Sequence, residues 1–246
     1  MGMIATNRGR LVPALFVALA ALVATGACRW PGERRAATGN AASATVSKSP
    51  TATPGAPATT LADRRPVVLF VGTSLTAGYG LDPDEAFPAL VQRKIDASRL
   101  VYRVVNAGVS GESSAGARRR IDWLLRQPVS VLVLETGAND GLRGQDPSAT
   151  RDNVQAILDA TRRLTPAPKL VLVAMEALPN YGEPYRRAFR AIYPELARKN
   201  GARLVPFLLA DVAGEQRLNQ ADGIHPNAEG EKLVAENIWK VLRPLL

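Results

Sequence analysis

Apolar runs of strand length alternate with segments of helical periodicity along residues 64–246, and this alternation limits the possible folds more than any other feature. The apolar runs are rich in Val and Leu and lack strict apolar–polar alternation, which is typical of strands covered on both faces. The predicted strands are 67–71, 101–105, 129–134, 170–174 and a shorter one at 203–207.

Between these runs, apolar residues recur every three or four positions, as on one face of a helix. We interpret the stripes as helix faces packed in a core rather than as ligand contacts. Ser148 and Asn227 each follow a proline and precede the start of a stripe. We predict them as N-caps of the corresponding helices. The stripes begin at Phe87, Ala117, Val154, Tyr185 and Leu233.

The alternation of strands and helices predicts a parallel sheet with right-handed crossovers and helices on both faces. In such sheets, ligands bind at the carboxyl ends of the strands. Ser74, Gly111 and Asn139 follow the first three predicted strands, and His225 lies in the loop before the last helix. We therefore expect these residues to meet at one edge of the sheet.

Ser74 lies in a glycine-containing turn after the first strand. A serine hydroxyl becomes a nucleophile when a neighbouring base takes its proton. The same serine could instead be only a helix N-cap. A phosphate-binding loop is disfavoured, because the segment lacks a P-loop lysine and its glycine spacing is not that of a dinucleotide-binding fingerprint.

His225 is the only histidine of the chain, and Asp222 precedes it by three residues. The carboxylate could reach back to one ring nitrogen, orient the imidazole and stabilise the imidazolium form. Alternatively, this segment is only a turn followed by a helix start. A single histidine excludes a histidine-rich metal centre.

Asn139 and Gly111 are candidates for stabilising an oxyanion, through a side-chain amide and a backbone N–H. Each residue also has a simpler explanation. The sequence Asn139-Asp140-Gly141 is typical of turns, and Gly111 could merely begin a helix.

Taken together, four blocks resemble the SGNH (GDSL-type) hydrolases, in order and at suitable intervals, and are most similar to the exported thioesterase I, lysophospholipase and arylesterase group. The resemblance extends over residues 66–246. The blocks are Gly72-Thr73-Ser74-Leu75, Gly111, Gly137-Ala138-Asn139-Asp140 and Asp222-Gly223-Ile224-His225-Pro226.

This resemblance implies a flavodoxin-like three-layer α/β/α fold with a five-stranded parallel sheet. It assigns Ser74 as nucleophile, His225 as base and Asp222 as the residue that orients the base. The oxyanion donors would be Ser74 N–H, Gly111 N–H and the Asn139 amide, with no metal and no cofactor. In this chain Thr73 replaces the aspartate usual in the family, so the hydrogen bonding of the turn must differ.

The expected function is that of an exported serine esterase, which hydrolyses carboxylic ester or thioester bonds of small-molecule acyl substrates through an acyl-enzyme. We expect a monomer whose substrate acyl chain contacts Leu142, Leu178 and Tyr181. Two alternatives stay open: a carbohydrate O-acetylesterase with the same triad, and a non-catalytic lipoprotein binding module on the same scaffold.

Residues 1–28 resemble a signal peptide, with Arg8 and Arg10 before an apolar run over 11–24. That run is too short to span about 30 Å of hydrocarbon. Cys28, the only cysteine, follows small residues as in a bacterial lipobox, although Thr25 replaces the usual aliphatic residue. We expect a periplasmic or cell-envelope lipoprotein, anchored to a membrane through lipidated Cys28; the alternative is a cleaved, soluble protein.

Residues 29–63 are rich in Ala, Thr, Ser and Pro and nearly lack aliphatic bulk, so we predict a disordered tether before a hydrolase domain over 64–246. The chain carries a net charge of +9. Its one tight basic run, Arg118-Arg119-Arg120, lacks interleaved aromatic residues. We interpret this run as a solvated helix face and expect no nucleic-acid partner.

Overall fold

The computed structural model describes residues 64–246, and the predicted signal segment, Cys28 and the tether lie outside the described residues. Its centre is a five-stranded parallel sheet with the strand order β2-β1-β3-β4-β5. The strands are β1 (Val67–Gly72), β2 (Arg103–Gly108), β3 (Val129–Glu135), β4 (Lys169–Val173) and β5 (Arg203–Val205).

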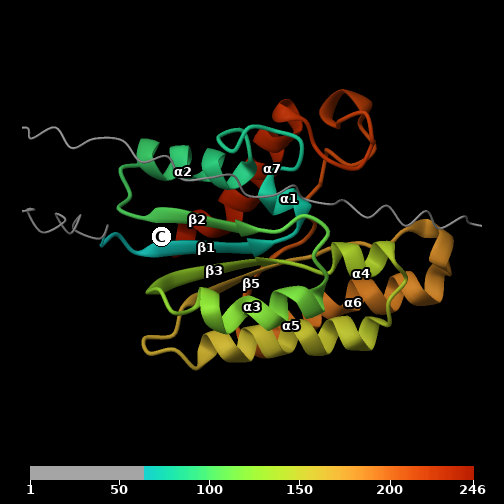
Figure 1. The fold of residues 1–246 in the computed structure, drawn as a ribbon, viewed down its shortest axis with the longest axis horizontal. Helices are drawn as coiled ribbons and strands as arrows, with labels where there is room; N and C mark the ends of the chain where they lie inside the picture. Colours follow the sequence, from blue (N-terminus) through green and yellow to red (C-terminus); the bar gives the residue numbers. More distant parts are fainter. Residues whose placement is uncertain (1–63) are drawn as a thin grey trace, which may run out of the picture. The chain divides into compact units, whose positions relative to one another are not determined.

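Helices cover both faces of this sheet, which confirms the predicted three-layer α/β fold (Figure 1). Helices α2 (Phe87–Ala97) and α7 (Ala228–Leu242) lie together on one face. The other face is covered by α3 (Ser114–Leu124), α5 (Pro147–Arg162) and α6 (Gly182–Asn200). In the described part of the chain, no helix combines the length and the apolar character needed to cross a bilayer.

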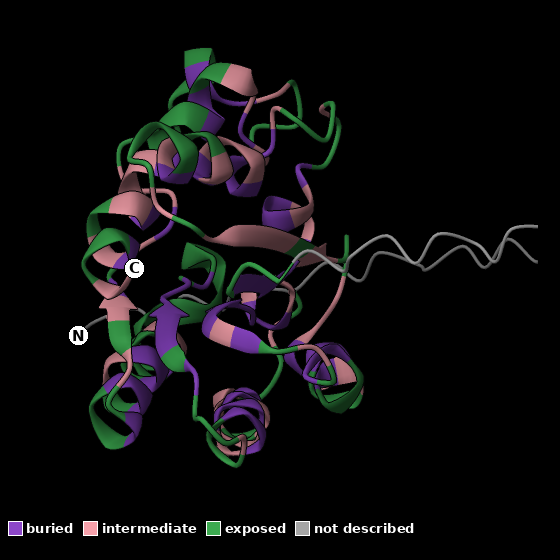
Figure 2. Cartoon of the chain, turned by 90° about the vertical axis from the view of Figure 1, so that its left-hand side faces the viewer, coloured by how far each residue is buried: buried purple, intermediate pink, exposed green. Residues whose placement is uncertain are grey.

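Burial explains why the strand sequences are apolar without alternation. Every residue of β1 is buried, because this strand has a partner on each side and helices on both faces. The buried residues in Figure 2 lie on the strands and on the helix sides that face them. Removing this apolar surface from water, at about 25 cal/mol per Å², is the main contribution to folding.

The structure corrects four details of the sequence prediction. The fifth strand ends at Val205 instead of position 207. The second strand begins at Arg103 and runs to Gly108, because pairing with β1, and not apolarity, sets its register. Asp146 caps α5, and its carboxylate accepts the N–H of Ser148, the residue predicted as the cap. Leu233 is 36% exposed, although it was placed in the apolar stripe of α7. The predicted N-cap Asn227 is confirmed.

The strand order reverses its direction at β1, since β2 lies on one side of it and β3 on the other. Such a reversal separates the loops after neighbouring strands and leaves a crevice at their carboxyl ends. Short helices fill the start of these connections: α1 (Ser74–Ala77) after β1 and α4 (Ala138–Leu142) after β3. The remaining short helical turns are η1 (Pro179–Tyr181), η2 (Gln216–Leu218) and η3 (Arg243–Leu245).

Candidate active site

Ser74 is the first residue of α1, directly beyond the carboxyl end of the central strand. Thr73, and not Ser74, is the N-cap, so the Ser74 hydroxyl is not used for capping. Gly72 is required in this turn, because a Cβ there would lie 1.9 Å from Thr76 Oγ1. The chain therefore turns tightly enough to present the serine at the rim of the sheet.

Asp222 and His225 form a compact turn in the loop before α7. Asp222 Oδ1 accepts the backbone N–H groups of Ile224 and His225 at 2.9 and 3.0 Å, and Oδ2 lies 2.6 Å from His225 Nδ1. The hydrogen bond from the imidazole, followed by those from the two backbone N–H groups, lowers the pKa of Asp222 to about 2. Asp222 is therefore a carboxylate over the whole neutral range.

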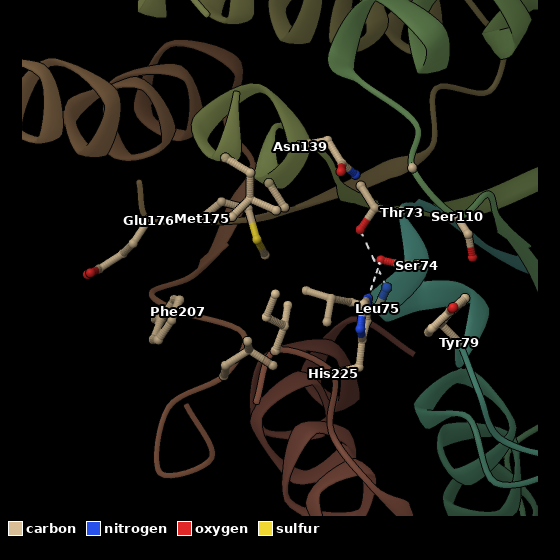
Figure 3. A pocket seen from close by; sticks show the side chains of 15 residues that line it. Thr73, Ser74, Leu75, Tyr79, Ser110, Asn139, Met175, Glu176, Phe207 and His225 are labelled. Atoms are coloured by element: carbon tan, nitrogen blue, oxygen red, sulfur yellow. Dashed lines mark hydrogen bonds between the residues drawn. The ribbon is translucent and has the colours of Figure 1, made fainter. Parts of the chain in front are cut away.

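The other ring nitrogen of His225 faces the serine. His225 Nε2 lies 2.9 Å from Ser74 Oγ, and Figure 3 shows the two side chains joined across the mouth of a cavity. In this geometry the imidazole can accept the hydroxyl proton while the Asp222 carboxylate stabilises the resulting cation. The structure thus brings together the three residues singled out in the sequence; their catalytic roles stay predictions.

Two residues that the sequence analysis missed hold the histidine loop in place. The Tyr79 ring lies against the His225 ring, with centroids 4.7 Å apart. Gln220 donates its backbone N–H to His225 O at 2.7 Å, and its side-chain amide donates to the carbonyl oxygens of Tyr79 and Pro226. The contacts of Tyr79 with His225 and Gln220 join segments more than 140 positions apart, so spacing along the chain does not reveal them.

The predicted oxyanion donors line the same cavity as Ser74. Gly111 has a φ of 77°, which favours glycine, and its carbonyl oxygen accepts from Arg143 Nη2 at 3.1 Å. Asn139 Nδ2 donates one N–H to Glu112 O at 3.0 Å. An amide nitrogen has two hydrogens, so Asn139 keeps a second donor. Arg143, which sequence reasoning missed, holds the Gly111 peptide in position.

The basic run Arg118-Arg119-Arg120 is not uniformly solvated as predicted. Arg118 and Arg119 are exposed. Arg120 instead forms a mostly buried ion pair with Glu112, with 2.6 Å between Nη2 and Oε2, and Nη2 also lies 3.5 Å from the carbonyl oxygen of Gly72. Arg120 therefore joins the loop that carries Gly111 to the turn that carries Ser74.

A buried carboxyl group, Glu135, supports the serine turn from below. Its Oε2 accepts the Thr73 N–H and the Thr76 hydroxyl, both at 2.8 Å, and the Thr73 hydroxyl lies 3.0 Å from both carboxyl oxygens. Burial outweighs these hydrogen bonds and raises the pKa of Glu135 to about 7. Thr73, at the position usually held by aspartate, is thus fixed by a carboxyl group from the neighbouring strand.

The raised pKa of Glu135 makes stability depend on pH. A carboxyl whose pKa is higher in the folded than in the unfolded state stabilises most below pH 4.5, and this contribution is lost as pH rises through about 7. Between pH 5 and 8, we expect the wild type to lose roughly 2 kcal/mol of unfolding free energy relative to Glu135→Gln. Denaturant titrations at both pH values measure this difference. Exposed Glu229→Gln is the control, and parallel pH dependence of all three proteins would contradict the expectation.

An apolar cavity of about 290 Å³ opens beside Ser74 and His225. Leu142 lines it, as expected, whereas the other two residues proposed to contact the acyl chain, Leu178 and Tyr181, do not. Tyr181 instead packs beside Gly144 and donates its hydroxyl to Leu142 O at 2.9 Å. The other apolar side chains of the wall, shown with Leu142 in Figure 3, are Leu75, Ala138, Met175, Phe207, Leu209 and Ile224.

The sequence of this domain matches a known family. Residues 70–233 match the model of the GDSL-like lipase/acylhydrolase family. The chain belongs to this family. The resemblance inferred from the four sequence blocks is therefore confirmed, and the chain is an ester-hydrolysing enzyme.

Individual relatives agree with this membership. Esterase TesA of Pseudomonas aeruginosa is 39% identical over 180 residues, which cover 73% of this chain and 89% of the relative. Thioesterase 1/protease 1/lysophospholipase L1 of Escherichia coli K12 is 39% identical over 181 residues, covering 73% and 84%. A crystal structure of TesA superposes with a TM-score of 0.70 at 39% identity and covers 73% of this chain and 99% of that one.

Proposed function

We propose that the protein hydrolyses carboxylic esters or thioesters through an acyl-enzyme formed on Ser74. The observation that carries this proposal is the 2.9 Å distance between Ser74 Oγ and His225 Nε2, two atoms from residues 151 positions apart. A hydroxyl placed in this way, next to an imidazole held by a carboxylate, is the arrangement needed for acyl transfer.

In the first half-reaction, Ser74 Oγ attacks the acyl carbonyl carbon while His225 Nε2 takes the hydroxyl proton. The imidazolium, stabilised by the Asp222 carboxylate, then protonates the departing alcohol or thiol. In the second half-reaction, His225 takes a proton from water, which attacks the acyl carbonyl, and then returns the proton to Ser74 Oγ. Asp222 stays ionised throughout, since its pKa is about 2.

The oxyanion of each tetrahedral intermediate needs donors beside Ser74. We assign this role to the N–H groups of Ser74 and Gly111 and to the second amide hydrogen of Asn139, because all three residues line the cavity around the serine. Donors fixed in place before the reaction stabilise the developing charge without reorganisation; one donor typically contributes about 10²–10³ in rate. The contacts of Arg143 and Glu112 hold two of them.

We assign the apolar cavity to the acyl chain of the substrate. Seven of its lining side chains are apolar, and each methylene transferred from water to such a wall contributes about 0.8 kcal/mol. The names of the relatives, esterase, thioesterase and lysophospholipase, fit acyl substrates of this kind. An acetyl group would leave most of the cavity empty, which disfavours the carbohydrate O-acetylesterase alternative.

A series of nitrophenyl esters from acetyl to octanoyl tests this assignment. We expect kcat/KM to rise from acetyl to hexanoyl by up to about fourfold per methylene. Leu142→Asp should reduce hexanoyl ester turnover about tenfold and acetyl turnover much less. The matched control is Leu178→Asp, an exposed leucine that does not line the cavity. Unchanged hexanoyl turnover in Leu142→Asp, or an enzyme that accepts acetyl alone, would refute the assignment.

We further propose that the protein is exported and anchored in the cell envelope as a monomer. Residues 1–28 serve as the signal segment, lipidated Cys28 is the anchor, and residues 29–63 tether the domain of residues 64–246. Cell fractionation of wild type and Cys28→Ser tests this layout. Wild type is expected in the membrane fraction and the variant outside it; the same distribution for both would exclude Cys28 as the anchor.

A further inference from the structure

The two ends of the sheet differ sharply in charge. Six stretches lie at the amino ends of the strands, where helices end and strands begin, and they contain no Asp or Glu side chain. Together they form what we call the amino-end surface. The stretches are 64–67, 98–103, 125–129, 163–169, 201–203 and 243–246. The first, second and fourth contain two Lys or Arg residues each, and the other three contain one each.

The loops at the carboxyl ends of the strands, which surround Ser74, have the opposite balance. Their only basic side chains are Arg143 and Arg217. Their acidic side chains outnumber these: Asp82, Asp84, Glu85, Glu112, Asp146, Glu176, Asp211, Glu215 and Asp222. Three of these acids pair with arginines of neighbouring helices: Asp84 with Arg93, Glu112 with Arg120 and Glu176 with Arg190. The other six still outnumber the two basic side chains of these loops. The described domain is therefore an electric dipole along the strand direction, with its positive end opposite the candidate active site.

Helix dipoles explain only part of this polarity. The five long helices end at the amino-end surface, and cations at helix C-termini are stabilising. That accounts for Arg99, Arg126 and Arg163, which directly follow helix ends. It also accounts for Lys169, which donates to the carbonyl oxygen of Leu245 at the end of η3. It does not account for Arg64, before β1, or for Arg203, which begins β5. These residues need another explanation.

Most of this positive charge is available to a partner. Arg64, Arg126, Arg163 and Arg203 are exposed, while Lys169 donates to the carbonyl oxygen of Leu245. Among the residues that the structure describes, the negative side chains nearby are Asp96, Asp122 and Asp159, in the last turns of the adjacent helices. Trp123, 65% exposed in the last turn of α3, adds an aromatic ring of the kind enriched at membrane interfaces.

We propose that the amino-end surface binds the anionic headgroups of a phospholipid bilayer and holds the domain with Ser74 directed away from that bilayer. The charge complementarity carries this proposal. A second observation agrees with it, because residues 1–63 join the domain at Arg64, on this same surface. Figure 1 shows the other chain terminus, marked C, at the same end of the sheet, and Figure 2 views the molecule from that side. The proposal does not depend on the chemistry at Ser74.

Vesicle binding of the full chain tests the proposal. Partition coefficients are measured on phosphatidylcholine vesicles and on vesicles with 30% phosphatidylglycerol, in low and high salt. The basal variant is Arg64→Gln/Arg126→Gln/Arg203→Gln. The control variant, Arg187→Gln/Arg217→Gln/Lys232→Gln, removes the same net charge from exposed positions elsewhere. For each protein we take the ratio of its partition coefficient on anionic vesicles to that on neutral vesicles. Because all three proteins share residues 1–63, differences in this ratio report only on the substituted side chains.

Each basic residue near an anionic surface strengthens binding several-fold. Because the basal variant removes three such residues, we expect it to lower the ratio about a hundredfold at low salt. The control variant should change the ratio less than twofold, and both differences should vanish at high salt. Unchanged nitrophenyl ester turnover in both variants shows that they are folded. Equal losses in the two variants, or no loss in either, would overturn the proposal. It would also be overturned if the basal variant lost binding to duplex DNA but kept the wild-type vesicle ratio.

Discussion

Ser74→Ala should abolish nearly all ester hydrolysis, lowering kcat by about 10⁴-fold or more. The variant keeps the cavity and the proposed oxyanion donors, so the small remaining rate would come from those groups acting on attacking water. The fold should be unchanged, because the hydroxyl is at the rim of the sheet and Thr73 caps α1. The measurement is kcat on a nitrophenyl ester, together with the unfolding midpoint.

The matched control for this substitution is Ser110→Ala. Ser110 is a second serine that lines the same cavity, but its only assigned role is to form part of the wall. This control should hydrolyse nitrophenyl esters at nearly the wild-type rate. If Ser74→Ala retained more than a tenth of the activity, the nucleophile would have to be reassigned.

His225→Ala should cause a loss of the same order, about 10⁴-fold, because no other histidine exists in the chain to take the proton of Ser74. The control is Tyr79→Phe, which preserves the ring packed 4.7 Å from the imidazole and should stay within a few-fold of wild type. Comparable activity of His225→Ala and Tyr79→Phe would exclude an imidazole base.

The pH dependence of the wild type provides a second measurement on the same group. The rate should fall as the solution becomes acidic, since a protonated imidazole cannot accept the hydroxyl proton. Asp222, with a pKa of about 2, stays ionised through this range and cannot cause the fall. A rate that is constant down to pH 4 would be incompatible with His225 as the base.

The fold was predictable because the apolar pattern of each segment matches the burial of the strand or helix that it forms. Val67 to Val71 is apolar at every position, as a strand covered on both faces requires, and glycine at position 72 marks its end. Each helix carries an apolar stripe between such runs. The start of β2 was misplaced by two residues because Val101 is apolar but 66% exposed; apolarity alone does not reveal the pairing register.

The central side chains of the candidate site were also predictable, since strand ends and a single imidazole restrict where they can be. Their supports were not. Glu135 ends the apolar run of β3, but its contact with Thr73 requires that β3 lie beside β1, and sequence does not give the strand order. Phe207 and Leu209 come from a long loop without periodicity, so their position in the cavity follows only from tertiary packing.

The single imidazole of this chain offers a spectroscopic advantage. The proton NMR spectrum of the protein contains one set of imidazole ring signals, and these need no assignment by mutation or isotope labelling. Because that ring contacts Ser74 Oγ directly, acylation or phosphonylation of the serine should displace the signals. Occupancy of the site could therefore be followed in the unmodified protein, with substrates that carry no chromophore.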